Sequence, residues 1–122
     1  MGQRMANTAK AKGSQFERDC VAVFNANGHP HAERRYGAGA QADKGDLQGF
    51  KMPRGGRGVV IECKNVAKIT LSTILAETAV ERANAGADLG VAIIKRRGRS
   101  AEHAYAVMTL AELAVLLKAA GY

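Results

Sequence analysis

Residues 46–64 of the 122-residue chain read DLQGFKMPRGGRGVVIECK, and this stretch predicts a β-hairpin at the centre of the fold. Its middle part, residues 51–58, is rich in glycine, proline and basic residues, which is typical of a turn. The part after the turn opens with Val59, Val60 and Ile61, a β-branched run typical of a strand that is buried on both faces. A charged residue that continues such a strand is unfavourable unless it is paired or bound to a metal ion.

Two acids and a lysine of this stretch are expected on one face of the hairpin. Arg54 is the midpoint between Asp46 and Glu62, so a turn centred on Arg54 sets the two acids directly opposite each other. Directly opposed residues of an antiparallel pair point to the same face, with Cβ atoms about 5 Å apart. Lys64, two residues beyond Glu62, shares that face because side chains alternate along a strand. Carboxylates this close repel each other, and such a cluster typically holds a hard divalent cation.

The length and composition indicate one globular domain. A chain of 122 residues with 47% apolar residues can bury one core but leaves no room for a second. No run approaches the roughly 18 apolar residues of a membrane span. The first residues lack the apolar core of a signal peptide, so we expect a cytoplasmic protein that does not bind membranes. The two cysteines, Cys20 and Cys63, form no CxxC motif, and we interpret both as small buried apolar groups.

The charge of the chain indicates a polyanionic partner. Eighteen Lys and Arg residues against eleven Asp and Glu residues give a net charge of +7, which favours nucleic acid. A basic ribosome-associated or membrane-surface protein would have the same balance. The basic residues also cluster where strand ends and turns are expected, which favours a binding surface over charge that only aids solubility. These clusters are Arg34 with Arg35, Lys51 with Arg54 and Arg57, and residues 95–99.

Hydrophobic periodicity and cap residues predict the order α-β-β-β-α-β-β-α, an α+β fold with a mixed sheet. Residues 1–13 are small, polar and basic, and we expect a flexible arm before a single domain over residues 14–122. A capping box of Ser14 and Glu17 predicts the start of the first helix. The expected elements are a helix at 14–27, a strand at 32–36, a glycine- and alanine-rich loop at 37–42, the hairpin strands at 46–50 and 59–64, a helix at 72–85, strands at 89–95 and 104–108, and a helix at 109–120.

Asp46, followed by Glu62, Cys63 and Lys64 at the end of an apolar strand, resembles the PD-(D/E)xK nuclease signature, with Gly45 in place of the usual proline. The expected order of helices and strands matches the core of that superfamily. The resemblance implies a restriction-endonuclease-like fold, in which helices flank a central mixed sheet.

A closer likeness is to archaeal-type Holliday junction resolvases and their phage relatives. Those families open with a helix carrying Gly-x-x-x-Glu-Arg, which stands here as GSQFER at residues 13–18. An arginine before a glycine- or serine-rich loop follows, and it matches Arg35 with Gly37 and Gly39. The resemblance implies an endonuclease of DNA recombination and repair that resolves four-way junctions by paired nicking. It also implies a homodimer, branched DNA as the partner and no small-molecule substrate.

The resemblance implies a role for each site residue, with Glu17, Asp46, Glu62 and Lys64 as the catalytic side chains. Asp46, Glu62 and the backbone carbonyl of Cys63 would hold Mg²⁺, for which Mn²⁺ can substitute, and Glu17 would bind a second ion or its water shell. Lys64 would orient the attacking water or help to deprotonate it. The expected DNA contacts are Arg34, Arg35, Gly37, Gly39, Lys44, Arg54 and Arg57.

Several alternatives stay open at this point. Asp43 competes with Asp46, although only Asp46 enters the strand in register with Glu62, and Glu17 has a structural alternative as the closing residue of a helix cap. The chain could also be another nuclease of the same superfamily, a basic nucleic-acid-binding protein that does not cut, or an unrelated binding module. For the dimer seam, the second helix and the apolar last helix are both candidates. The apolar residues of that last helix are Leu110, Leu113 and Leu117.

Overall fold

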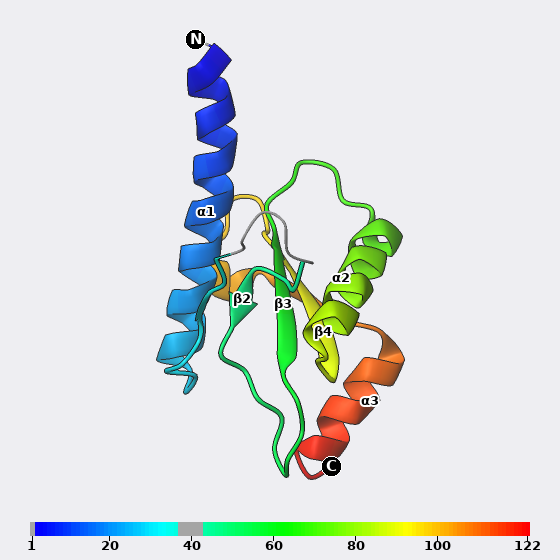
Figure 1. Ribbon diagram of the computed structural model, residues 1–122. Coiled ribbons are helices and arrows are strands. Elements are labelled where there is room, and N and C mark those ends of the chain that lie inside the picture. The colour runs from blue at the N-terminus through cyan, green and yellow to red at the C-terminus, as the bar shows by residue number, and fades with distance from the viewer. Residues whose placement is uncertain (1, 37–42) are drawn as a thin grey trace.

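The sheet has five strands whose spatial order is also their order in the chain, β1-β2-β3-β4-β5. The computed structural model describes residues 2–36 and 43–122, with side chains from residue 10 onward (Figure 1). Strands β3 and β4 run parallel, and the other three neighbouring pairs are antiparallel. The strands are β1 (Glu33–Arg34), β2 (Leu47–Gln48), β3 (Val59–Lys64), β4 (Leu89–Ile94) and β5 (Tyr105–Val107).

Helices cover both faces of this sheet, and Figure 1 shows α1 and α2 on opposite sides of it. The helices are α1 (Gly2–Ala26), α2 (Leu71–Ala85), the short 3-10 helix η1 (Ala101–His103) and α3 (Leu110–Ala119). Phe16 and Cys20 of α1 share one core cluster with Val91 of β4, among other strand residues. Ile74 of α2 shares another with Ala92. Because neighbouring residues of β4 point to opposite faces, this strand is buried along its whole length.

The β2–β3 hairpin has the register that the sequence predicts. Leu47 pairs with Ile61, which sets Asp46 opposite Glu62, and the backbone N–H of Asp46 donates to the Ile61 carbonyl over 2.9 Å. Arg54, at the centre of the turn, is the one non-glycine residue of the described chain with a positive φ, 59°. The hairpin prediction is therefore confirmed, and Asp46 and Glu62 share a face of the sheet.

One extra residue, Gly49, interrupts the hairpin between the acids and the tip. Nearer the tip, Lys51 pairs with Gly58. This register is shifted by one residue from that of Leu47 and Ile61. Gly49 has a φ of 99°, and a Cβ at this position would collide with the His31 carbonyl. Only glycine fits such a bulge without strain. The register of the acids is thus set separately from the register of the tip.

The first helix differs from its prediction. Helix α1 begins at Gly2, twelve residues before the predicted start at Ser14, so residues 2–13, where a flexible arm was expected, belong to the helix. Ser14 lies inside the helix and does not cap its start. Residues 2–13 are mostly Ala, Lys, Gln, Arg and Met, whose helix propensity outweighs the roughly 1 kcal/mol that Gly13 costs inside a helix.

The remaining helices and strands are confirmed, with changes in their bounds, and the loop expected at 37–42 lies outside the described residues. The Thr109 side chain caps α3 by accepting the Glu112 N–H over 3.2 Å, as the predicted capping box requires. Strand β1 has two residues where five were expected at 32–36. The α+β class, with a mixed sheet of five strands flanked by helices, is confirmed. Within the described residues, no helix is both long enough and apolar enough to cross a membrane.

Candidate metal centre

Glu62 and Lys64 lie toward the carboxyl end of β3, on the face of the sheet that α2 covers. Side chains alternate along β3, and Ile61 and Cys63 pack in the core cluster that includes α1, so Glu62 and Lys64 point to the other side. Asp46 faces that side as well, because it stands opposite Glu62. The strand acids therefore lie in the layer between the sheet and α2.

Three carboxylates from separate segments converge in this layer. Asp43 precedes β2, Glu62 belongs to β3 and Glu81 belongs to α2, and one carboxylate oxygen of each lies within 4.8 Å of the other two. Asp46 adjoins them, because its carboxyl group is within hydrogen-bonding reach of that of Glu62. A cavity of about 280 Å³ opens beside these acids and is lined in part by Lys64. The Asp43, Glu62 and Glu81 carboxylates could hold a metal ion.

Two of these acids are almost completely buried. Glu62 is 5% exposed and Glu81 is 3% exposed, and the Glu81 Oε1 atom has no hydrogen-bond partner among the described residues. Glu62 cannot supply a proton to it when both groups are ionised. The one salt bridge that the described residues form here joins Lys64 Nζ to Glu77 Oε2 over 3.0 Å. Because buried charges without partners are unfavourable, this cluster requires protons or a cation.

Burial and mutual repulsion raise the pKa values of the clustered acids. The pKa of Asp46 is about 8, chiefly because of burial and then of Glu62, while the Cys63 N–H lowers it. The pKa of Glu62 is also about 8, again chiefly through burial; the contact with Asp46 lowers it and that with Glu81 raises it. The opposite effects on Asp46 and Glu62 describe one proton shared by the pair. Burial also raises the pKa of Glu81 to about 7. The metal-free cluster therefore holds protons near neutral pH that a bound cation would displace.

Lys64 keeps its proton in this environment. Burial lowers its pKa, but the hydrogen bond from Lys64 to Glu77 and the negative charges of Glu62, Glu77 and Asp46 outweigh burial, so the pKa is raised overall. An ammonium group with a raised pKa is a poor general base. Of the two roles expected for Lys64, orienting a water or stabilising charge fits this environment better than removing a proton.

Glu17 and Cys63 lie beside the cluster. Glu17 Oε1 accepts a hydrogen bond from Arg34 Nε over 3.0 Å. Burial and the charge of Asp46 raise the pKa of Glu17, and Arg34 works against them. The Cys63 N–H donates to Asp46 Oδ2 over 2.8 Å, and its carbonyl leaves the strand on the same edge. The expected carbonyl ligand is thus next to Asp46, whereas Glu17 is tied to an arginine.

Three basic residues that were expected to contact DNA lie near the acids. Arg34 is the partner of Glu17. The backbone N–H of Arg35 donates to the Asp46 carbonyl over 2.7 Å, and the Arg35 Nε atom is buried without a partner in the part of the chain that the structure describes. Lys44 is half-buried in the segment before β2.

The other expected DNA contacts are not close to the acids. Arg54 and Arg57 are exposed at the hairpin tip, at the bottom of Figure 1. A strand advances about 3.3 Å per residue, so this tip lies roughly 20 Å from Glu62. Gly37 and Gly39 lie outside the described residues.

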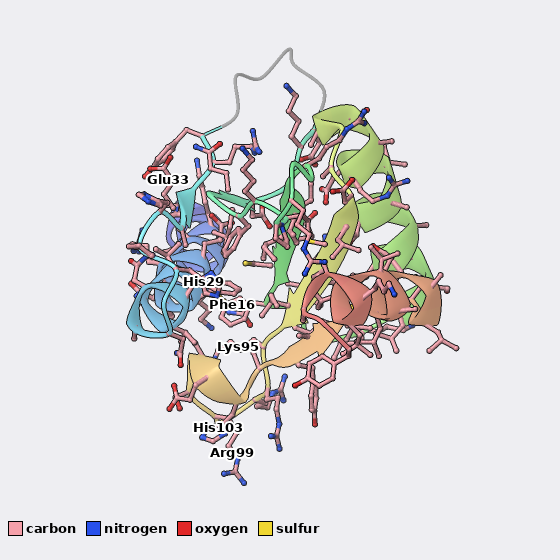
Figure 2. The ribbon with its side chains drawn as sticks, turned by 90° about the horizontal axis from the view of Figure 1, so that it is seen from below. Phe16, His29, Glu33, Lys95, Arg99 and His103 are labelled. Carbon is pink, nitrogen blue, oxygen red and sulfur yellow. The ribbon has the colours of Figure 1, made fainter. Side chains whose placement is uncertain are left out.

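A basic turn, residues 95–99, lies at the same end of the sheet as the acids. It follows β4, whose carboxyl end is next to that of its parallel neighbour β3, and the Lys95 N–H donates to the Lys64 carbonyl over 2.9 Å. Figure 2 shows Arg99 projecting outward from this turn, while Lys95 Nζ lies 6.0 Å from the centre of the Phe16 ring. The exposed arginines of this turn are therefore better placed for phosphates at the acidic cluster than those of the hairpin tip.

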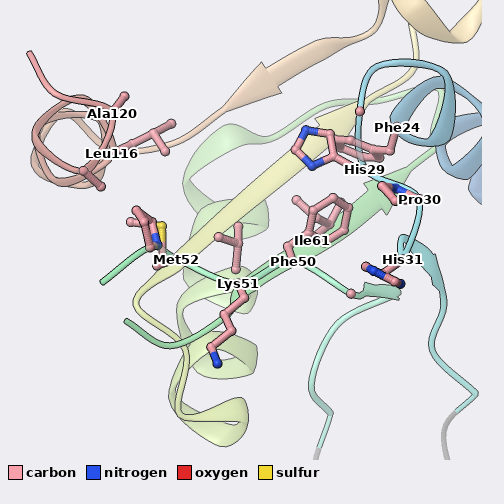
Figure 3. Close-up of a pocket in the computed structure, with 15 residues that line it drawn as sticks. Phe24, His29, Pro30, His31, Phe50, Lys51, Met52, Ile61, Leu116 and Ala120 are labelled. Atoms are coloured by element: carbon pink, nitrogen blue, oxygen red, sulfur yellow. The ribbon is translucent and has the colours of Figure 1, made fainter. Parts of the chain in front are cut away.

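A separate apolar cavity of about 550 Å³ lies between the end of α1, the hairpin and α3 (Figure 3). The Phe24 ring centre is 4.6 Å from that of Phe50 and 5.8 Å from that of His29. None of the lining residues is an acid or a cysteine. His29 thus belongs to an aromatic cluster.

Comparisons of the chain with protein families, with curated proteins and with solved structures found no match.

Glu77 and Glu81 of α2 belong to the site, although they were not among the residues expected there. The buried line of α2 consists of Ile74, Thr78 and Glu81, at helical spacing. A carboxylate at a core position of a helix is the signal that could have identified Glu81, because glutamate is almost never fully buried without a partner. Asp43, considered only as the alternative to Asp46, also belongs to the cluster.

Proposed function

We propose that the protein is a metal-dependent nuclease of the PD-(D/E)xK type that hydrolyses phosphodiester bonds in DNA and has a restriction-endonuclease-like core. The observation that carries this proposal is the opposed pair Asp46 and Glu62, with Lys64 two residues further along the same face. Carboxylates at one strand end offer ligands for a hard cation, and the amine offers positive charge for the phosphoryl oxygens. The net charge of +7 supports a polyanionic substrate.

In the proposed reaction, Asp46, Glu62 and the Cys63 carbonyl would hold Mg²⁺, or Mn²⁺ in its place. A divalent cation supplies a bound water of lowered pKa and positive charge against the phosphate. Lys64, as an ammonium group, orients the water or balances the charge that builds on the phosphoryl oxygens. Arg35, whose Nε atom lacks a partner among the described residues, would bind a neighbouring phosphate in this proposal.

The preferred substrate in this proposal is branched DNA, which a homodimer cuts at two opposed strands. Helix α3 supports the dimer, because it has no buried residue and four of its five Leu and Val side chains are exposed. Their exposed fractions are 81% for Leu110, 39% for Leu113, 49% for Val115 and 43% for Leu117. Helix α2 instead packs its buried residues against the sheet, and these are Ile74, Thr78 and Glu81. A two-fold interface through α3 would pair two identical sites, which a four-way junction requires.

Cleavage assays on matched substrates test the proposal. A mobile four-way junction and a linear duplex of the same sequence are incubated with Mg²⁺, with Mn²⁺ and with EDTA. We expect cleavage that depends on the metal ion, is faster on the junction and falls at paired, symmetric positions. Equal rates on both substrates would indicate a general or repair-type endonuclease. Binding without cleavage under every metal condition would contradict the nuclease proposal and indicate a non-catalytic nucleic-acid-binding protein.

A further inference from the structure

We propose that the acidic cluster binds two divalent cations that share Glu62, one between Asp46 and the Cys63 carbonyl and the other between Asp43 and Glu81. This inference deepens the proposed function, since it adds to the nuclease site a second ion held by α2. The contacts support a shared ligand, because Glu62 stands opposite Asp46 across the hairpin and one of its carboxylate oxygens lies within 4.8 Å of oxygens of Asp43 and Glu81. A carboxylate with two oxygens can bridge two ions.

When all of its carboxyl groups are ionised, the cluster is too negative for one divalent ion to balance. The site contains five carboxylates, those of Asp43, Asp46, Glu62, Glu77 and Glu81. Lys64 is the one basic side chain of the described residues in a salt bridge with any of them. Five carboxylates and one ammonium group leave four negative charges, which two divalent cations balance. Glu17 does not enter this count, because Arg34 already neutralises it.

The Glu81 side chain independently indicates a ligand at the second position. It is 3% exposed, its Oε1 atom is buried without a hydrogen-bond partner in the described chain, and it lines the cavity beside the cluster. A buried carboxylate oxygen that lacks a donor normally coordinates a metal ion or a water that the site retains. The cavity volume of about 280 Å³ leaves room for an ion together with several waters.

Each acid retains an oxygen for its own ion. Asp46 Oδ2 is occupied by the Cys63 N–H, and Asp43 Oδ1 by the Gly45 N–H, so the other oxygen of each aspartate can coordinate. The ligand oxygens of Asp43, Glu62 and Glu81 lie within 4.8 Å of one another. Opposite ligands of Mg²⁺ stand at most about 4.2 Å apart, and those of Ca²⁺ about 5 Å. Small side-chain adjustments therefore suffice for Mg²⁺ or Mn²⁺.

Titration with Mn²⁺ in the absence of DNA tests the second site directly. The number of bound ions is measured by calorimetry and by the decrease of the free-ion signal in electron paramagnetic resonance. We expect two ions per chain in the wild-type protein, with the signature of two magnetically coupled ions in the loaded sample. Glu81→Gln and Asp43→Asn should each bind one ion and show no coupling. Asp43 is exposed, so its variant should fold normally even if Glu81→Gln does not.

Glu33→Gln is the matched control, because it removes one negative charge from an exposed glutamate of β1 that lies outside the cluster. It should bind two ions, like the wild type. One ion in the wild-type protein, or two coupled ions in Asp43→Asn, would overturn the inference. Circular dichroism and thermal unfolding of each variant report whether its fold is intact.

This result is separate from the outcome of the cleavage assay. Two coupled ions in a protein that cuts no DNA would support the two-ion site and contradict the nuclease. Cleavage by a protein that binds a single ion would support the nuclease and contradict the two-ion site. If no ion binds at millimolar Mn²⁺, both proposals fail.

Discussion

One carboxylate oxygen of Glu62 in β3 lies within 4.8 Å of one of Glu81 in α2, and both side chains are at most 5% exposed. After β3, the chain thus turns back and packs α2 on the same sheet. Glu81 of the helix then faces Glu62 of the strand. The packing of α2 on the sheet holds this arrangement in place, since Ile74 of the same helix is buried there. The site is therefore built between two layers of the fold, and its chemistry depends on both.

Asp46→Asn and Glu62→Gln should each abolish cleavage while junction binding stays the same or becomes tighter. Each change removes a proposed metal ligand, which lowers the cleavage rate. It also removes one negative charge opposite the phosphates, so the affinity for DNA does not decrease. Cleavage and gel-shift assays on the same junction measure the two effects. Glu33→Gln, which removes an exposed carboxylate of β1, should retain wild-type cleavage. Full activity of either site variant in Mg²⁺ would refute the assignment.

The metal-free protein should lose stability as the pH rises from about 4.5 to about 8. The folded-state pKa values of Asp46 and Glu62 are about 8 and that of Glu81 is about 7, above their ordinary values. Within this window the folded state keeps protons that the unfolded state has released, so the free energy of unfolding falls with pH. Urea unfolding in EDTA at a series of pH values measures this trend.

Added Mg²⁺ should reverse part of that decrease, and more at pH 8 than at pH 6, because the ion competes with protons for the same oxygens. Glu81→Gln should be more stable than the wild type at pH 8 in EDTA and closer to it at pH 5, since the variant has no charge to bury. A free energy of unfolding that rises with pH in EDTA, for both proteins alike, would contradict the raised pKa values.

Lys64→Ala should lower turnover far more than DNA affinity. The ammonium group is proposed to act on charge that develops during the reaction, and removal of such a group typically costs about 10²–10³ in rate. Single-turnover cleavage and equilibrium binding on one junction separate the two quantities. Glu77→Gln, which removes the half-exposed partner of Lys64, should leave the rate closer to that of the wild type. Equal decreases in rate and affinity would identify Lys64 as a simple phosphate ligand.

Removing Arg97 and Arg99 together should weaken DNA binding more than removing Arg54 and Arg57. All four arginines are exposed, but only the first pair lies at the end of the sheet where the acids are. The slope of log affinity against log salt should flatten by about 0.9 for each phosphate that the variant no longer neutralises. DNA-binding titrations at salt concentrations from about 50 to about 200 mM give this slope. The two double variants carry equal charge, so their slopes can be compared directly. A larger effect at the hairpin tip would place the DNA on the opposite end of the molecule.

Leu117→Glu should convert a dimer of twice 12.9 kDa into a monomer, as measured by light scattering. The side chain is 43% exposed on α3, and a charge there should oppose an apolar two-fold contact. Leu71→Glu, at a 48% exposed position of α2, is the control and should remain dimeric. On a supercoiled cruciform, the monomer should give nicked circles where the dimer gives linear product. A wild-type monomer at micromolar concentration would rule out paired cutting.

The local part of the site could be predicted from the sequence, and the part that depends on long-range packing could not. The spacing of Asp46 and Glu62 about the turn residues predicted the pair from about twenty consecutive residues, although the bulge at Gly49 sets the register of the acids separately from that of the tip. Glu81 joins them only because α2 packs at one particular rotation on the sheet. Its helical spacing from Ile74 marks a buried face, but a single polar residue on that face does not reveal what it meets.

The start of α1 shows the limit of composition as a guide to structure. Small, basic and polar residues suggested an arm at residues 1–13, although most of them also favour a helix. Ser14 and Glu17 have the spacing of a cap inside a longer helix, where the pattern has no capping role. Glu17 instead meets Arg34, a pairing between α1 and β1 that depends on how the helix lies on the sheet.

The bulge at Gly49 makes the end of the hairpin an adjustable part of the molecule. Because one unpaired residue absorbs the mismatch between the two registers, residues 53–57 can be lengthened, shortened or replaced without shifting Asp46 relative to Glu62. The tip is therefore a suitable attachment point for a fluorescent probe or a short peptide tag. A reporter there would follow the protein on DNA from roughly 20 Å away, at about 3.3 Å per strand residue, without touching the acids.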